Sequence, residues 1–321
     1  MKMLNVSSSP HVRDKDSTRG IMLDVCIAML PTAVYGVVQF GINSLLVILV
    51  TVLAAVLSEY FWEKGMRKPV TICDLSAVVT GMILALNMPP EIPLWIPALG
   101  AVFAIIIAKQ MFGGLGQNWM NPALAGRCFL LISCAKFMNN FTSAGLGFDS
   151  TTGATPLAVM KTAVRAGADP MEGVSLMQLF VGRVPGTIGE VSAIALLFGA
   201  AYLLWRKVIS WHIPLVYIAT VAVFVFIFGS HSAEYVLAQV LGGGLIFGAF
   251  FMATDYVSTP LTRDGQIVYA VVIGLLTGLF RIFGTGAEGV SYSIIIGNML
   301  APLIESATIP KAFGRREAKK K

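Results

Sequence analysis

Long apolar segments alternate with short polar ones along nearly the whole chain. Each apolar segment has about 17 to 22 residues, enough for a helix rising about 1.5 Å per residue to cross a hydrocarbon core. Ten such segments can be counted, at approximately 22–40, 43–62, 71–88, 93–112, 121–137, 189–206, 212–229, 235–254, 267–283 and 290–307. The pattern predicts an all-α integral membrane protein with about ten transmembrane helices.

Proline and glycine mark the ends of several predicted spans. Pro89 and Pro90 end the third span, Pro93 begins the fourth, and the glycine-rich stretch 113–116 separates the fourth from the fifth. The longest polar interruption, 138–188, is too rich in Gly, Asp and Pro to cross a membrane. This segment is therefore expected to be a loop outside the bilayer.

The two sets of five predicted spans show a weak internal repeat. Residues 75–89 can be aligned with 241–255, and each stretch is followed by a proline-bearing linker, a span, a glycine-rich break and another span. Because five crossings are an odd number, the second copy must enter the membrane in the opposite direction, which produces an inverted repeat. The sequence is accordingly divided into an amino-terminal segment, a first repeat, a loop, a second repeat and a basic tail: 1–20, 21–137, 138–188, 189–308 and 309–321.

Composition supports the membrane class, and the charges indicate an orientation. Hydrophobic residues make up 56% and charged residues 12% of the chain, too few charges to cover a soluble globule of 321 residues. Most of the 23 Lys and Arg residues fall on one side if the amino terminus is cytoplasmic. Both termini are then predicted to be cytoplasmic and the 138–188 loop extracytoplasmic. The net charge of +6 follows from this topology and needs no nucleic-acid partner.

Thr155 stands out within the polar loop because Pro156 and an apolar run follow it. Local rules predict Thr155 as an N-cap, Pro156 as the first helical residue, and a short helix to Arg165 closed by Gly167. A helix amino terminus also favours an anionic group on the Thr155 oxygen. The residues alone leave two alternatives, an ordinary capping threonine or a threonine that carries a phosphate ester.

A resemblance favours the second alternative. Residues 149–155 match a pattern at which a flavin transferase attaches FMN, through its phosphate, to the last threonine; the matching positions are Asp149, Thr152, Gly153, Ala154 and Thr155. Further blocks that extend the resemblance over almost the whole chain are 113–118, 121–123, 186–190 and 251–255. The chain resembles the RnfD/NqrB family. Its length and short amino-terminal segment are more similar to RnfD, the D subunit of the Rnf ion-translocating electron transport complex, than to the longer NqrB.

The resemblance implies a fold and a function. The fold would be ten helices in two inverted five-helix repeats, similar to that of urea transporters, in the lipid of a bacterial or archaeal cytoplasmic membrane. FMN would be covalently bound to Thr155 on the extracytoplasmic side, with Asp149 recognised by the flavin transferase. A second, non-covalent flavin such as riboflavin would lie elsewhere in the fold. Other Rnf-type subunits would complete a complex that couples ferredoxin and NAD redox chemistry to Na⁺ or H⁺ transport.

Ionisable residues in or near the spans form a second group of candidates. Asp74, Asp255, Glu59 and Arg127 lie where charge is costly, so each is either part of an ion pathway or an interfacial residue. Lys161 and Arg165 on the predicted short helix would either stabilise a reduced flavin or lie in solvent. The four Cys and three His residues show no metal-binding spacing, so no metal site is expected.

Two other function classes stay open at this point. A urea- or ammonium-type channel would share the inverted fold but would have no reason to contain the flavin-attachment pattern. A structural scaffold subunit would not need Thr155 for electron transfer. The chain contains neither an iron–sulfur cysteine framework nor a nucleotide-binding motif, so an oxidoreductase role requires partner subunits.

Overall fold

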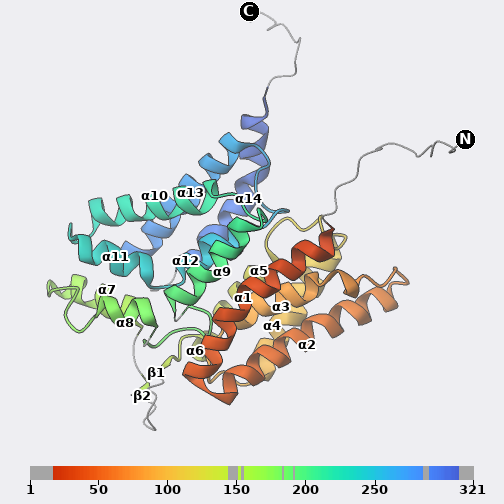
Figure 1. The fold of residues 1–321 in the computed structure, drawn as a ribbon, viewed down its shortest axis with the longest axis horizontal. Helices are drawn as coiled ribbons and strands as arrows, with labels where there is room; N and C mark the ends of the chain where they lie inside the picture. The colour runs from red at the N-terminus through yellow and green to blue at the C-terminus, as the bar shows by residue number, and fades with distance from the viewer. Residues whose placement is uncertain are drawn as a thin grey trace, which may run out of the picture.

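The described part of the protein is helical apart from one short β-ribbon (Figure 1). The computed structural model describes residues 17–143, 151–152, 155–182, 184–190, 192–284 and 289–310. The ribbon pairs β1 (Thr142–Ser143) with β2 (Thr151–Thr152) in antiparallel register. The expected all-α membrane architecture is therefore confirmed at the level of secondary structure.

The helices fall into an amino-terminal set, a middle pair and a carboxy-terminal set. The first set comprises α1 (Thr18–Phe40), α2 (Ile42–Gly65), the 3₁₀ turn η1 (Ile72–Asp74), α3 (Ser76–Leu86), α4 (Trp95–Phe103), the π-helical segment η2 (Ala104–Lys109), the 3₁₀ turn η3 (Gln110–Phe112), α5 (Pro122–Ser133) and α6 (Ala135–Met138). The middle pair is α7 (Pro156–Ala166) and α8 (Leu176–Val181). The last set comprises α9 (Ala193–Trp205), α10 (His212–Phe228), α11 (Ala233–Leu241), α12 (Leu245–Phe247), the π-helical segment η4 (Gly248–Met252), α13 (Arg263–Ile282) and α14 (Val290–Thr308).

Five helices in the described residues are long and apolar enough to cross a membrane. They are Thr18–Phe40, Ile42–Gly65, Trp95–Phe112, Arg263–Ile282 and Val290–Thr308. A sixth candidate is the pair Ala233–Leu241 and Leu245–Met252, which is bent by 61° at its break. Four shorter apolar helices, α3, α5, α9 and α10, occupy the remaining predicted segments.

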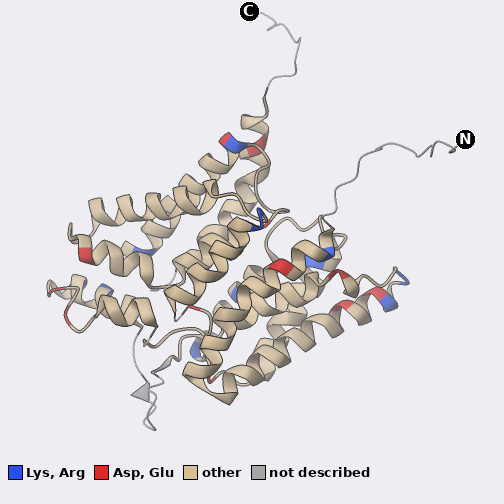
Figure 2. Cartoon of the chain, in the orientation of Figure 1, with Lys and Arg blue, Asp and Glu red and all other residues tan. Residues whose placement is uncertain are grey.

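The ends of the bundle differ. The start of α1 and the end of α14 lie on one side in Figure 1, whereas α7, α8 and the β-ribbon lie on the opposite side. Charged residues are concentrated toward the helix ends, and the middle of the bundle is largely uncharged (Figure 2). This distribution is expected for helices whose central parts face hydrocarbon.

Small residues allow the two sets to approach each other closely. A Cβ added to Gly199 in α9 would lie 2.1 Å from the Ala28 carbonyl oxygen of α1, so only glycine fits this crossing. At the end of the same contact, Asp24 accepts hydrogen bonds from Tyr202 (2.8 Å) and from Arg206 (3.0 and 3.1 Å). Packing of small residues and one charged cluster therefore join α1 to α9.

Candidate functional site

The helix that follows Thr155 is confirmed as predicted. Thr155 is extended (φ −60°, ψ 150°), its Oγ1 accepts a hydrogen bond from the Ala158 N–H at 3.3 Å, and Pro156 is the first helical residue. The helix ends at Gly167, whose φ of 71° is left-handed. Thr155 is 8% exposed, so its hydroxyl lies at the edge of the folded protein rather than in an open loop.

A pocket opens beside Thr155. Residues from four parts of the chain line it: Thr155, Pro156, Leu157, Leu179, Val184, Pro185, Gly186, Glu190, Leu241, Gly242 and Gly243. The pocket therefore lies between the start of α7 and the break that separates α11 from α12. Its lining is mostly apolar with exposed backbone, the kind of surface that binds a planar organic group.

Glycines form the wall of this pocket at the α11–α12 break. Gly243 and Gly244 have φ values of 63° and 65°, which L side chains rarely adopt. A Cβ on Gly243 would lie 2.8 Å from Leu157 Cδ2, and one on Gly244 would lie 2.2 Å from Glu190 Oε1. Gly243 and Gly244 are therefore required by their backbone conformation and by close packing against α7 and the Glu190 loop.

A buried arginine holds the same break. Arg281, 3% exposed at the end of α13, donates to the carbonyl oxygens of Gly242 (3.0 Å), Gly243 (2.9 Å) and Gln239. Arg281 was not among the candidates that the sequence suggested. Its partners are 38 to 42 residues away in the sequence, so no local pattern indicates them.

The loop that carries Glu190 connects the pocket to the first set of helices. Ile188 and Gly189 donate backbone hydrogen bonds to the carbonyl oxygens of Met88 (3.0 Å) and Leu86 (2.7 Å). Glu190 Oε1 forms an ion pair with Arg127 of α5 at 3.2 Å. Arg127 is thus a buried structural partner at the junction of the two sets.

The residues around Thr155 fit a covalently attached flavin phosphate. The hydroxyl that would carry the ester lines the pocket, and glycine backbone without side chains forms the opposite wall. The Arg281 guanidinium directly behind Gly243 supplies positive charge next to the pocket. The hydroxyl in the lining and the cation behind Gly243 are compatible with a phosphate ester on Thr155, whereas the Glu190 carboxylate in the same lining would repel it.

Lys161 and Arg165 do not point toward the Thr155 pocket and do not simply extend into solvent. Lys161 donates to the Phe280 carbonyl oxygen (3.3 Å), and Arg165 donates to that of Gly284 (2.9 Å). Both cations therefore bind the carboxy-terminal end of α13, where cations are favoured by the helix dipole. Burial, with the Arg165 charge nearby, lowers the pKa of Lys161.

The other residues of the flavin-attachment pattern are only partly described. Thr152 pairs with Thr142 in the β-ribbon. Asp149, Gly153 and Ala154 lie outside the described residues. The pattern can therefore be placed at the end of the bundle that contains α7.

The two candidate aspartates lie in different clusters. Asp255 follows η4 and accepts a hydrogen bond from Ser258 at 2.9 Å; burial raises the pKa of its carboxyl, and this hydrogen bond opposes the rise. Asp74 is the last residue of η1 and accepts hydrogen bonds from the Ser76 N–H (2.8 Å) and Oγ (2.6 Å). The structure does not bring the two carboxylates together into one path.

Asp255 lines an inner pocket between the two sets of helices. The lining combines aliphatic and aromatic side chains with a few polar groups: Ile21, Met22, Val25, Val79, Ile83, Asn121, Leu203, Val208, Ile209, Phe250, Phe251, Thr254, Asp255 and Tyr256. Asn121 caps α5, accepting from Ala123 N at 3.0 Å, and its amide donates to the Met252 carbonyl oxygen at 3.4 Å. Two segments of the predicted family pattern, 121–123 and 251–255, thus meet at this pocket.

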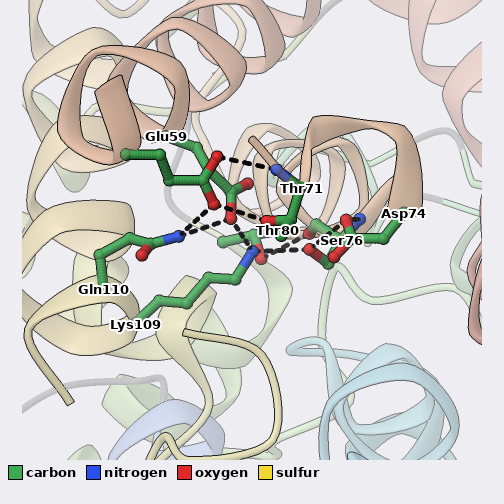
Figure 3. Close-up of polar contacts among 8 residues, drawn as sticks. Glu59, Thr71, Asp74, Ser76, Thr80, Lys109 and Gln110 are labelled. Carbon is green, nitrogen blue, oxygen red and sulfur yellow. Dashed lines mark hydrogen bonds and ion pairs between the residues drawn. The ribbon is translucent and has the colours of Figure 1, made fainter. Parts of the chain in front are cut away.

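Asp74 belongs to a buried polar cluster that also contains Glu59 (Figure 3). Lys109 Nζ lies 2.7 Å from Glu59 Oε1, and both side chains are at most 2% exposed. Glu59 was a candidate in the sequence, whereas Lys109 was not. The sequence does show Lys109 at the end of an apolar span, but Glu59 is 50 residues away, so the pair could not be predicted from neighbouring residues.

The helical fold, the apolar spans and the buried charges at both ends define a polytopic membrane protein with polar sites inside its bundle. A family model places it more narrowly: the chain belongs to the NQR2, RnfD, RnfE family, which matches residues 5–314.

Three relatives illustrate the similarity. The D subunit of the Na⁺-translocating ferredoxin:NAD⁺ oxidoreductase complex of Acetobacterium woodii is 46% identical over 319 residues, covering 99% of this chain and 97% of the relative. The D subunit of the proton-translocating ferredoxin:NAD⁺ oxidoreductase complex of Clostridium ljungdahlii is 43% identical, with coverage of 98% and 97%. The D subunit of the ion-translocating oxidoreductase complex of Escherichia coli is 35% identical, with coverage of 98% and 99%.

Proposed function

We propose that this chain is the D-type membrane subunit of an ion-translocating ferredoxin:NAD⁺ oxidoreductase complex and carries FMN as a phosphate ester on Thr155. The observation that carries the proposal is the position of the Thr155 hydroxyl, at the amino end of α7 and in the lining of a pocket walled by Gly242 and Gly243. The full-length similarity to D subunits of such complexes supports the choice of complex. Bound flavin would supply the electron-carrying chemistry.

The chain's own residues would position that group. The α7 helix, docked on α13 through Lys161 and Arg165, holds Thr155 in place. Arg281 keeps the carbonyl groups of the glycine break turned away from the pocket by binding them. A covalent link maintains the group at its site on the outer side of the membrane, where a dissociated cofactor would be lost by dilution.

The test is in-gel flavin fluorescence of denatured protein co-expressed with a flavin transferase that acts outside the cytoplasm. Wild type and Thr162→Ala should give a fluorescent band, and Thr155→Ala should give none. Thr162 is a matched control because it lies in the same helix but bonds only to carbonyl groups of its own turn. Absence of a band in every variant, with the transferase active on another target, would refute flavin attachment and favour a urea- or ammonium-type channel.

A scaffold role is tested on the assembled complex. Thr155→Ala should abolish coupled electron transfer, because the flavin then has no attachment point. The complex should still assemble, because the substitution removes only one hydroxyl that caps α7. Intact coupled electron transfer in that variant would instead assign the chain a purely structural role.

We also propose that a second, non-covalent flavin such as riboflavin binds the inner pocket. The aromatic rings of Phe250 and Phe251 offer stacking surfaces, and Asn121 and Asp255 offer hydrogen-bonding groups. Acid extraction of the Thr155→Ala protein should release this flavin, and Phe250→Ala should lower its amount. A flavin-free extract from well-folded Thr155→Ala protein would refute a second site.

The proposed arrangement in the membrane has ten crossings in two inverted repeats, as in urea transporters. The five long helices, the bent pair and the four shorter apolar helices supply ten candidates. A left-handed residue lies within the third predicted span of each repeat, Leu75 (φ 64°) before α3 and Gly244 (φ 65°) before α12. This correspondence supports the repeat.

Orientation can be tested with single cysteines in a cysteine-free background. In intact cells, an impermeant maleimide should label Asp169→Cys, in the proposed extracytoplasmic loop. Met66→Cys, at the end of α2, should react only after lysis. Both wild-type side chains are exposed, so accessibility within the protein does not limit either reaction. Labelling of Met66→Cys in intact cells would reverse the proposed topology.

A further inference from the structure

Three parts of the first helical set converge on one buried polar cluster, defined here as Glu59, Glu63, Thr71, Asp74, Ser76, Thr80, Lys109 and Gln110 (Figure 3). They are the last turns of α2, the left-handed break before α3 and the end of η2. Glu59 is 0% exposed and lies six residues before the end of α2, about 9 Å along the helix axis. The cluster therefore extends from the bundle end into an apolar span.

The Lys109 ammonium lies at its centre. Nζ donates to Glu59 Oε1 at 2.7 Å and to Ser76 Oγ at 2.6 Å. Ser76 Oγ in turn donates to Asp74 Oδ1 at 2.6 Å. Gln110 Nε2 donates to the same Glu59 oxygen at 2.7 Å. A single cation thus bridges carboxylates from two different elements.

The fixed charges of the cluster do not balance. Glu59, Glu63 and Asp74 contribute three carboxylates, and Lys109 contributes one ammonium. Full ionisation would leave two uncompensated negative charges in a largely buried site, and isolated charges are costly there. The cluster is therefore most stable when it holds a further positive charge.

The carboxylates differ in how they are satisfied. Glu63 accepts from the Thr71 N–H (2.9 Å) and Oγ1 (2.5 Å), and Asp74 accepts from the N–H and Oγ of Ser76. Lys109 and Gln110 both donate to Glu59 Oε1, whereas Glu59 Oε2 is buried and has no hydrogen-bond partner among the described residues. This bare oxygen marks the position where the missing positive charge can bind.

We propose that Glu59 Oε2 is an exchangeable binding site for a monovalent cation, H⁺ or Na⁺, and that Lys109 is its built-in competitor. Binding at Oε2 neutralises one carboxylate and weakens the hold of Glu59 on Lys109. The ammonium keeps its bond to Ser76 and its proximity to Asp74. The inference deepens the proposed function, on which it rests, by assigning a cation site to this chain of an ion-translocating complex.

The cluster reaches the surface at the bundle end. Thr71, which binds Glu63, is exposed, and Asp74 is half-buried. Glu63 lies one turn beyond Glu59 on α2 and shares the Gln110 amide with it, at 3.4 Å. A cation entering from this end meets Glu63 and Asp74 before it reaches Glu59.

The test uses infrared difference spectroscopy on the purified complex, with exchange of the bathing buffer. One arm titrates pH without Na⁺, and the other replaces choline with Na⁺ at constant pH. The variants are Glu59→Gln, Glu59→Asp and Lys109→Met. Glu91→Gln is the matched control because Glu91 is exposed in the turn that follows α3.

In wild type and Glu91→Gln, we expect a carboxyl or carboxylate band that responds to pH, to Na⁺ or to both. Glu59→Gln should lack this band. Response to pH alone assigns H⁺, and a shift of the carboxylate band by Na⁺ assigns Na⁺. Lys109→Met should bind the cation at least about tenfold more tightly, because the ammonium that competes with the cation for the Glu59 carboxylate is lost. A purely structural ion pair would give no Glu59 band that responds to pH or to Na⁺ in the wild type.

Two results would overturn the inference. One is a set of difference spectra in which wild type and Glu59→Gln are identical; the other is weaker or unchanged cation binding in Lys109→Met. Glu59→Asp retains a carboxylate and covers the case in which Glu59→Gln does not fold. Fluorescence of the Thr155 flavin in the same samples reports the proposed function separately, so either proposal can fail alone.

Discussion

A methyl group added at Gly244 would displace Glu190, one of the residues that line the Thr155 pocket. The Gly244 backbone is left-handed (φ 65°), and a Cβ would lie 2.2 Å from Glu190 Oε1 and 2.5 Å from Glu190 Cδ. Gly244→Ala must therefore strain the backbone and push the Glu190 carboxylate away. That carboxylate is the partner of Arg127 at 3.2 Å, so the displacement also disturbs a buried charge.

The expected loss of stability is the sum of two terms. A left-handed alanine costs about 1–2 kcal/mol relative to glycine. Overpacking against a buried side chain costs about a further 1–3 kcal/mol. The total of about 2–5 kcal/mol corresponds to a fall in the thermal midpoint of about 4–10 °C, at about 2 °C per kcal/mol for a chain of this size.

Gly116→Ala separates the two terms. Gly116 is also left-handed (φ 89°), but its Cβ would meet nothing within 4 Å. This variant should therefore lose only the backbone term, or about 2–4 °C in midpoint. Thermal unfolding of both purified variants, followed with a thiol-reactive dye that reports newly exposed cysteines, measures the difference.

Equal midpoints for Gly244→Ala and Gly116→Ala would refute the reasoning. Such a result would mean that Glu190 has room to move and that the wall beside Thr155 tolerates a side chain. A larger loss in Gly244→Ala should be accompanied by weaker flavin fluorescence at Thr155, because the displaced Glu190 lines the pocket.

Two further predictions concern how the pieces of the structure are joined. Lys161→Met removes a charged donor to the Phe280 carbonyl oxygen and should lower the free energy of unfolding by about 1.5–3 kcal/mol. Denaturant unfolding measures this loss, and no loss would mean that α7 is held by apolar contacts alone. Asp24→Asn should cost less, about 1 kcal/mol or below, because the Arg206 side chain is 48% exposed and screened. The Asp24→Asn loss should shrink at high salt, and an effect independent of salt would contradict an electrostatic origin.

Local signals in the sequence were sufficient for the helix that carries Thr155. A capping threonine, a proline at the first position and a closing glycine act within one turn of their own backbone, so the boundaries of α7 follow from residues 155–167. Apolar length was equally informative, since each predicted span contains a helix. Both properties depend on neighbours in the sequence.

Contacts between distant residues could not be predicted in the same way. Lys109 and Arg281 both lie near the ends of apolar helices, and counting alone could assign each to a side of the membrane. Their carboxylate and carbonyl partners are 38 to 50 residues away, and only the packing of whole helices brings them together. The pocket beside Thr155 is also formed by segments that are far apart in the sequence.

The contact between Asp24 and Arg206 has a consequence for motion. It fastens the first helix of one set to the first helix of the other at the bundle end farthest from Thr155. The Glu190 loop holds the first set near the start of α9, at the opposite end, through Arg127 and the carbonyl oxygens of Leu86 and Met88. A separation of the two sets would therefore have to break polar contacts at both ends of the bundle, including those beside the Thr155 pocket.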